Sequence, residues 1–475
     1  MPDESGEGCR GMDRRRFLKG SLGLTAAASL SGVASAFAAD GAAGSGSSFR
    51  RRPRLRVAVV GAGAFGGWTA LELARRGRRR GVEVVLVDAW GPGNSRSSSG
   101  GETRVIRSIY GGDALYTDWV TRALERWREA GREWGEDLYR RTGVLWMFRG
   151  DDGYARSSLP LLAERGLTFE DLGLTAASRR FPQVAFDGVR TVLYESEGGY
   201  LAARRSCRRV ASAVAAAGGE LRTAHARPGA IVGGEMASLH LSDGSTLAAD
   251  RYVFACGPWL GRLFPEVIGA GVTPTRQDVY FFGVPPGEAR FGDDRFPVWV
   301  DWGDRLFYGV PTAFGRGFKV ADDTRGEPVD PTSLERTVSA DGLARARRLL
   351  DQRFPPLAGA PLVEARVCQY ENSPDGHLIL DRHPQAANAW IAGGGSGHGY
   401  KLGPAVGEHV AQLVLGETES LPRFSIGRLA ESGDGSRTPP EAPDAATPER
   451  SRRVDPTAAL GDNRSPRSTP YRPWR

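Results

Sequence analysis

Residues 56 to 88 read RVAVVGAGAFGGWTALELARRGRRRGVEVVLVD, and this stretch decides the fold. An apolar run enters the glycine-rich turn GAGAFG, residues 61 to 66. A helical amphipathic pattern follows, and a second apolar run ends on Asp88. This order predicts a strand, a glycine turn, a helix and a second strand. Residues 76 to 81 are expected to form a basic loop that lengthens the spacing to Asp88.

The glycine turn has the spacing that binds a dinucleotide. Gly61 permits a tight turn, Gly63 lets the backbone approach a pyrophosphate, and Gly66 lets the helix pack closely on the strand. The helix N-terminus then faces the phosphates, and Asp88 is placed to accept a ribose hydroxyl. A tight structural turn in another α/β protein is the alternative interpretation. The motif by itself does not distinguish FAD from a nicotinamide cofactor.

Composition excludes several classes of protein. The chain has 475 residues, 40% hydrophobic and 25% charged, which is ordinary for a globular protein with two sizeable domains and excludes disorder as the main state. Although the net charge is +7, the arginines are interspersed with acids and no basic face with interleaved aromatic residues appears, so no nucleic-acid partner is expected. The four cysteines show no paired metal-ligand spacing, so neither a metal site nor a disulfide framework is expected.

Lysine is almost absent from the chain. Of 63 lysines and arginines only three are lysines, namely Lys19, Lys319 and Lys401. A lysine carries a compact ammonium whose pKa moves when it is buried, whereas the larger guanidinium stays charged. Lys319 and Lys401 are therefore candidates for positions where an arginine could not do the task. The alternative is that two surface lysines survive by chance.

The first 40 residues resemble a twin-arginine export signal. Residues 14 to 19, RRRFLK, precede a mild apolar stretch that ends near a small-residue cleavage site. That stretch is too short and too rich in Ala, Gly and Ser to be a stable membrane anchor. We expect the twin-arginine export machinery to deliver the folded protein to the periplasm or the exterior. Residues 41–53 are predicted to be a linker, and residues 427–475 a disordered tail.

A second glycine-rich turn, IAGGGSGHGYKLG at residues 391 to 403, also follows an apolar strand and precedes a helix. It contains Gly395, Gly397 and Gly399. A helix N-terminus at this point can stabilise negative charge on a flavin ring, so two such turns in one chain favour FAD. The segment GETRVIR places Arg104 and Arg107 three residues apart, where they either clamp an anion together or form a solvated basic turn.

Two further segments indicate that the cofactor domain is discontinuous. Residues 252 to 259, YVFACGPW, form another buried strand that runs into a glycine turn, and residues 276 to 320 are rich in aromatic residues with strand-like alternation. We predict an α/β fold, α+β overall, in which an antiparallel-sheet substrate domain is inserted into a Rossmann-like FAD-binding domain. The predicted FAD-binding domain comprises 54–141, 193–274 and 376–426, and the substrate domain comprises 142–192 and 275–375.

These segments together resemble a known family over roughly residues 54 to 424. The ordered signatures are GAGAFG with Asp88, GETRVIR, YGVP followed by GFK, VCQYENSPDGHLILDRHP, and GGSGHGYKLGPAVGE. They are similar to those of the monomeric sarcosine oxidase and N-methyltryptophan oxidase family, which lies within the D-amino-acid oxidase class of FAD amine oxidoreductases.

The resemblance implies roles for three residues on the flavin side of the site. Cys368 matches the family's cysteine that bonds covalently to the flavin, and Arg104 matches a flavin-adjacent arginine. Lys319 matches the lysine that activates molecular oxygen above the flavin ring.

On the substrate side, the resemblance implies four more site residues. Lys401 and Arg107 match the pair that holds the substrate carboxylate, and Tyr308 and Tyr370 match tyrosines of the substrate cavity.

Two positions depart from the family pattern. Gly100 stands where the family has a flavin-side histidine, which bears on the efficiency of flavin attachment. Asp323 stands where the family has a substrate-side histidine, and an acid near the cavity changes which amine fits.

The implied function is that of a monomeric, exported FAD oxidase of secondary or N-methyl amino acids. Such an enzyme oxidises the carbon–nitrogen bond of its substrate to an imine, which hydrolyses, and reduces molecular oxygen to hydrogen peroxide. One alternative is a dehydrogenase of the same fold that passes electrons to another carrier. A second alternative is a flavoprotein that binds amino acids without turnover.

Overall fold

The computed structural model describes residues 54–431, apart from the side chains of residues 78–80, 430 and 431. The predicted export signal, the linker up to residue 53 and the tail from residue 432 onward lie outside the described residues. All described residues belong to one compact unit that begins at Arg52. Within residues 54–431, no helix is both long enough and apolar enough to cross a membrane.

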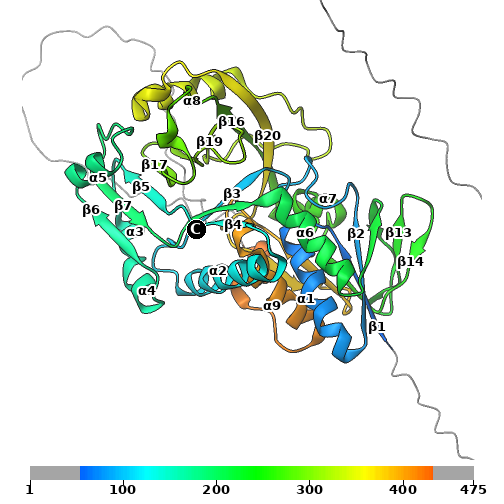
Figure 1. The fold of residues 1–475 in the computed structure, drawn as a ribbon. Coiled ribbons are helices and arrows are strands. Elements are labelled where there is room, and N and C mark those ends of the chain that lie inside the picture. Colours follow the sequence, from blue (N-terminus) through cyan, green and yellow to red (C-terminus); the bar gives the residue numbers. More distant parts are fainter. Residues whose placement is uncertain (1–53, 432–475) are drawn as a thin grey trace, which may run out of the picture. The chain divides into compact units, whose positions relative to one another are not determined.

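The first sheet has six strands and contains the predicted glycine turn. Its strands are, in order, β21 (Ile379–Arg382), β22 (Ala389–Gly393), β15 (Arg251–Phe254), β1 (Leu55–Val60), β2 (Val82–Asp88) and β9 (Glu220–Thr223). The central strand β1 pairs in parallel with both β2 and β15, and only the edge strand β21 runs antiparallel to its neighbour (Figure 1). The late segment 252–259 thus does return beside the first strand, as its apolar pattern suggested.

Alternate residues of β1 are buried on opposite faces of this sheet. Val57 and Val59 pack into a core that contains residues of four helices, α1 (Ala64–Arg80), α2 (Ala114–Trp134), α6 (Ala203–Ala216) and α9 (Gly403–Leu415). Ala58 and Val60 pack into a second core with a small sheet, β10 (Ala226–Pro228), β13 (Leu239–Leu241) and β14 (Thr246–Leu247). Because both faces are covered, the strand is apolar throughout, as parallel strands usually are.

Helix α1 is longer than the sequence pattern indicated. It runs through Arg80 and ends at Gly81, whose φ of 72° is left-handed and whose N–H donates to the Gly77 carbonyl. The prediction of a basic loop over residues 76–81 is therefore wrong. A glycine tolerates the left-handed conformation that closes a helix, so Gly81 ends the helix where the arginine run does not.

The second sheet has eight strands and carries the aromatic segments. Its order is β20 (Leu362–Asn372), β16 (Thr273–Phe282), β19 (Phe318–Asp322), β18 (Leu306–Gly309), β17 (Val298–Trp302), β5 (Val144–Phe148), β7 (Thr191–Glu195) and β6 (Phe169–Leu172). All its pairs are antiparallel except β17 with β5. Helix α8 (Ala340–Arg353) packs against it over an aromatic core. The predicted mixed α/β fold class is confirmed, whereas the boundaries of two domains stay a prediction.

The remaining elements are short and connect the two large sheets. They include β3 (Thr103–Ile106), β4 (Tyr139–Arg140), β8 (Gly199–Ala202), β11 (Ile231–Val232), β12 (Glu235–Met236), α3 (Gly153–Arg156), α4 (Leu159–Glu164), α5 (Leu174–Arg180), α7 (Leu260–Leu263) and α10 (Gly427–Glu431). Strands β3, β8 and β4 form a three-stranded sheet of their own.

Helix α10 corrects the predicted start of the tail. Residues 427–431 are helical, and the Arg428 side chain donates to the Asp375 carboxylate at 2.8 Å. Leu429 packs against the core beneath the first sheet. The glycine- and serine-rich composition after Ile426 gave no sign of helix α10. The ion pair and the apolar contact that hold this helix both involve residues distant in the sequence.

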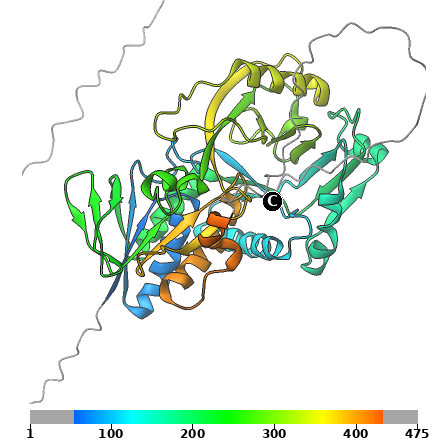
Figure 2. The same ribbon diagram turned by 180° about the vertical axis from the view of Figure 1, so that it is seen from behind.

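The close packing of α1 on α9 generates a stability prediction. The two helices lie side by side in both views (Figures 1 and 2), and a Cβ at Gly407 would lie 2.6 Å from the backbone carbonyl carbon of Trp68. We expect Gly407→Ala to lower the free energy of unfolding by about 1–3 kcal/mol, because overpacking outweighs the gain of about 1 kcal/mol in helix propensity. Gly150→Ala, where a Cβ meets open space, is the matched control. Denaturant unfolding measures both variants, and equal stability of the two would contradict the packing argument.

Candidate active site

A cavity of about 740 Å³ lies at the carboxyl ends of the parallel strands. Its walls come from the glycine turn after β1, the end of β2 at Asp88, the turn after β15, and the glycine turn after β22. In open α/β sheets, ligands bind at this edge. The chain therefore provides one large site where four segments far apart in sequence meet.

The first glycine turn has no room for side chains. A Cβ on Gly61, which has a φ of 103°, would lie 2.2 Å from the Ala255 carbonyl oxygen, and a Cβ on Gly66 would lie 1.9 Å from the Gly61 carbonyl oxygen. Gly63 is the N-cap of α1 and lines the cavity. The glycines at positions 61 and 66 thus let the turn pack closely against the backbone of Ala255 and against itself. They also leave the start of α1 open to a ligand.

Asp88 closes the same turn from the second strand. Its Oδ2 accepts a hydrogen bond from the Ala62 N–H at 2.8 Å, and its Oδ1 accepts one from the Trp90 N–H at 2.9 Å. Burial raises the pKa of this carboxyl. Asp88 lines the cavity, so it can hold the turn in shape and still present its carboxylate to a ribose. The ribose contact stays a prediction.

The second glycine turn forms another part of the wall. Gly395, Gly397 and Gly399 all line the cavity, and a Cβ on Gly397 would lie 2.9 Å from the Tyr370 ring. A short 3-10 turn, η5 (Tyr400–Leu402), separates the glycines from α9. The glycines therefore let the aromatic ring of Tyr370 contact the turn directly.

A smaller cavity, of about 60 Å³, adjoins the large one. Arg104 and Tyr370 line both cavities, so they form the shared wall. The smaller cavity is also lined by Arg107, Trp146, Tyr308, Asp323, His398 and Lys401, among others. Four of the five predicted catalytic residues, Arg107, Lys401, Tyr308 and Tyr370, therefore meet in one place.

Two of the three cations that line the smaller cavity, Arg107 and Lys401, are buried. Lys401 is 3% exposed, its Nζ donates to the His398 carbonyl oxygen at 2.9 Å, and it lies 5.0 Å from the centre of the Tyr110 ring. The Arg107 guanidinium lies 4.8 Å from the centre of the same ring. Burial, and then the nearby Arg107 charge, lower the pKa of Lys401 well below its usual value. An anion entering this cavity would meet two cations that lack water.

A buried carboxylate stands behind these cations. Glu195 on β7 accepts hydrogen bonds from the Ser108 N–H and from the Trp146 indole N–H, the latter at 3.3 Å. Burial raises the pKa of Glu195. Its hydrogen bonds hold the segment that carries Arg107 against the second sheet.

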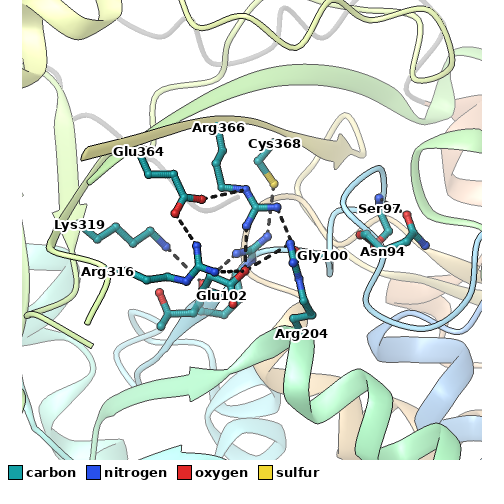
Figure 3. Close-up of polar contacts among 12 residues, drawn as sticks. Asn94, Ser97, Gly100, Glu102, Arg204, Arg316, Lys319, Glu364, Arg366 and Cys368 are labelled. Carbon is teal, nitrogen blue, oxygen red and sulfur yellow. Dashed lines mark hydrogen bonds and ion pairs between the residues drawn. The ribbon is translucent and has the colours of Figure 1, made fainter. Parts of the chain in front are cut away.

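Gly100, the first departure from the family pattern, has a structural reason. A Cβ at Gly100 would lie 1.7 Å from the Asn94 carbonyl oxygen, so no side chain fits without a shift of the backbone. The Gly100 carbonyl oxygen accepts hydrogen bonds from Arg204 at 2.8 Å and from Arg366 at 3.3 Å. Both guanidinium groups also approach Glu102, at 3.3 and 3.2 Å (Figure 3). Two arginines thus contact the Gly100 carbonyl oxygen and Glu102 beside it.

The large cavity fits FAD. Two glycine turns leave no space for side chains where a dinucleotide would approach, a carboxylate ends the second strand, and a helix begins at the first turn. The volume also suits an extended dinucleotide. The residues that would hold FAD are Gly61, Gly63, Asp88, Arg104 and the turn of residues 395–399.

A family model described as FAD dependent oxidoreductase matches residues 56–413. The chain belongs to this family. A monomeric sarcosine oxidase from Bacillus sp. (strain B-0618) is 30% identical over 79% of this chain and 96% of the relative. An N-methyl-L-tryptophan oxidase from Salmonella enteritidis PT4 is 26% identical over 78% of this chain and 98% of the relative. The solved structure of L-proline dehydrogenase from P. horikoshii has the same fold, with a TM-score of 0.70, 19% identity and coverage of 80% and 98%. The predicted family and the class of FAD-dependent oxidoreductase are confirmed.

In this FAD dependent oxidoreductase, Cys368 lies beside the shared wall. Its Sγ accepts a hydrogen bond from the Arg104 guanidinium at 3.3 Å, and the residue lies on β20 opposite Gln277. Cys368 does not line either of the two cavities. The thiolate is the form in which a cysteine attacks a cofactor.

Lys319, the fifth predicted catalytic residue, also lies behind the wall. It is 2% exposed, and its Nζ donates to the Thr103 carbonyl oxygen at 3.2 Å, one residue before Arg104 (Figure 3). Its Nζ lies 5.3 Å from the centre of the Tyr308 ring. Burial, and then the Arg104 charge, lower the pKa of Lys319 to about 7. It lines neither cavity, so the structure brings it near the site but not into the substrate cavity.

One residue of the FAD dependent oxidoreductase site had no signal in the sequence. Glu371 lines the large cavity and accepts a hydrogen bond from the Gly395 N–H at 3.3 Å, and burial raises its pKa to about 8. It follows Tyr370 on the same strand, where alternation places successive side chains on opposite faces. Both neighbours nonetheless line the large cavity, and Tyr370 lines the smaller one as well.

Proposed function

We propose that this chain is an exported FAD oxidase of small secondary or N-methyl amino acids, with hydrogen peroxide as a product. The observation that carries the proposal is the pair of buried cations, Arg107 and Lys401, in a small cavity that shares a wall with the dinucleotide cavity. An amino-acid carboxylate would satisfy both charges. The relatives named for sarcosine and for N-methyl-L-tryptophan support this substrate class. The volume of about 60 Å³ favours a small substrate over a large one.

The residues of the chain would contribute by position and charge. Arg107 and Lys401 bind the carboxylate, which orients the substrate carbon toward the shared wall, and Tyr308 and Tyr370 enclose it and exclude water. FAD, when bound, supplies the acceptor for the hydride. Charge-assisted hydrogen bonds in a water-poor cavity are strong. Displacing Arg107 or Lys401 would therefore weaken both the binding and the orientation of the substrate.

A dehydrogenase that uses another electron acceptor remains a second candidate. The observation that favours it is the position of Lys319, which lines neither cavity and already donates to the Thr103 carbonyl oxygen. An oxidase needs this ammonium close enough to oxygen for its charge to act.

Covalent flavin attachment through Cys368 predicts that the yellow colour stays with acid-precipitated protein. Cys368→Ser should release the flavin into the supernatant, because the thiolate beside Arg104 is the nucleophile. Cys256→Ser is the matched control: Cys256 lines the large cavity, and burial raises its thiol pKa so that it stays protonated. Release from wild-type protein, or from the control alone, would contradict attachment at Cys368.

The carboxylate clamp predicts a binding defect in Lys401→Met. Loss of one charge-assisted hydrogen bond costs about 1.5–3 kcal/mol, so the KM for an amino-acid substrate should rise roughly 10- to 150-fold. Flavin content should stay near that of the wild type, because Lys401 does not line the large cavity. Steady-state kinetics and the visible spectrum measure the two effects. An unchanged KM would remove Lys401 from the substrate site.

Lys319→Met separates the oxidase from the dehydrogenase. If the ammonium stabilises negative charge that develops on oxygen, the variant should slow flavin reoxidation by about two orders of magnitude, with anaerobic reduction by substrate nearly unchanged. In the wild type, reoxidation should slow as the pH rises through about 7, because Lys319 then loses its proton. Stopped-flow absorbance follows both half-reactions. Wild-type reoxidation rates in the variant would remove Lys319 from oxygen activation. A wild-type enzyme that is itself slow with oxygen, yet fast with an artificial acceptor, would favour the dehydrogenase.

A further inference from the structure

Asp323 brings a carboxylate into the small cavity that Arg107 and Lys401 also line. It follows β19, lines the cavity, and accepts a hydrogen bond at Oδ1 from the Tyr370 hydroxyl at 2.6 Å. No residue in the described part of the chain donates a hydrogen bond to Oδ2. One carboxylate oxygen is therefore fixed by a tyrosine, and the other remains available to a ligand.

Charged groups of both signs line the small cavity. Arg107 and Lys401 come from the segment after β3 and from η5, whereas Asp323 comes from the second sheet. The titratable and charged groups that act on Asp323 or share its cavity are Arg104, Arg107, Tyr308, Lys319, Asp322, Tyr370, His398, Tyr400 and Lys401. Of these, Asp322 is occupied by Arg305 at 2.6 Å and does not line the cavity. Asp323 is thus the carboxylate that a bound cation would meet there.

We propose that Asp323 recognises the ammonium group of the substrate and accepts one proton from it. This inference rests on the proposed function, since it assigns the amine end of the substrate whose carboxylate Arg107 and Lys401 hold. In this step the N–H bond breaks, its electron pair stays on nitrogen, and an O–H bond forms at Oδ2. No oxidation occurs in this step. The amine is then neutral, which is the form whose lone pair can assist removal of a hydride from the adjacent carbon.

The chemistry of the cavity supports this assignment. An amino acid is a zwitterion at neutral pH, and a cavity lined by both cations and a carboxylate offers partners for both of its charges. Burial raises the pKa of Asp323 to about 6, so the group is a carboxylate at neutral pH yet more basic than an exposed aspartate. Burial also raises the pKa of Tyr370, so its hydroxyl stays protonated and donates to Oδ1.

Two ligands of nearly equal shape test recognition without turnover. Trimethylglycine carries a permanent positive charge, and 3,3-dimethylbutanoate replaces its nitrogen by carbon. Titration of the oxidised holoenzyme, followed by the visible flavin spectrum, gives a Kd for each. Wild-type protein should bind trimethylglycine about tenfold or more tightly than 3,3-dimethylbutanoate, which lacks the positive charge, at pH 8. This preference should fall as the pH drops through about 6, where Asp323 becomes protonated.

The variant Asp323→Asn should abolish the preference and its pH dependence, whereas the matched control Asp322→Asn should keep both. An unchanged preference in Asp323→Asn would overturn the proposal. So would a wild-type protein that binds trimethylglycine no better than its isostere, a result that needs no variant to fold. A preference that depends on Asp323 in a protein that oxidises no amino acid would leave this inference standing and refute the proposed reaction.

Discussion

Burial of positive charge beside the cofactor cavity is the constraint on which the site depends. Lys401 is 3% exposed, and burial disfavours its charged form. A buried cation is costly unless opposite charge or hydrogen bonds compensate it. The chain supplies partial compensation through the His398 carbonyl, the Tyr110 ring and the carboxyl group of Asp323. A substrate carboxylate would complete this compensation. Burial of the cations is costly without an anion beside them, and the same burial makes the site selective for one.

The two large sheets have different tasks in building this site. The first sheet brings the glycine turns and Asp88 to one edge, where backbone atoms approach too closely for any side chain. The second sheet contributes Tyr308, Asp323 and Tyr370 from strands rich in aromatic residues. Arg104 joins the two, because it lines both cavities and donates to Cys368. Tyr370 and Tyr400 line both cavities as well, so the two ligand spaces share several side chains.

The sequence predicted those features that depend on local pattern. The strand, glycine turn and helix at residues 55–80 follow from the spacing of the apolar residues and of the glycines. The scarcity of lysine pointed to Lys319 and Lys401, which are both buried. Features that depend on distant partners were missed. Helix α10 is held by Asp375, and Glu371 lines the large cavity only because β20 packs beside the glycine turn at Gly395. The end of α1 was misjudged because one glycine, not the basic run before it, closes the helix.

The role of Lys319 in oxygen activation stays a prediction. The motif placed it in the catalytic set, whereas the structure places its ammonium on the Thr103 carbonyl oxygen, behind Arg104. A burial-lowered pKa of about 7 means that this ammonium would be partly deprotonated at neutral pH. Whether it acts on oxygen therefore depends on how close oxygen can come when the cofactor is bound.

The central claim is that this FAD dependent oxidoreductase oxidises small amino acids and uses oxygen as the acceptor. The most direct test mixes the purified holoenzyme anaerobically with a panel of N-methyl and cyclic amino acids, follows bleaching of the flavin, and then admits oxygen and measures peroxide. The account predicts that a small zwitterionic substrate bleaches the flavin and that oxygen restores the colour, with one peroxide formed per flavin reoxidised. Bleaching without peroxide would contradict the oxidase assignment. Absence of bleaching with every amino acid in the panel would contradict the substrate class.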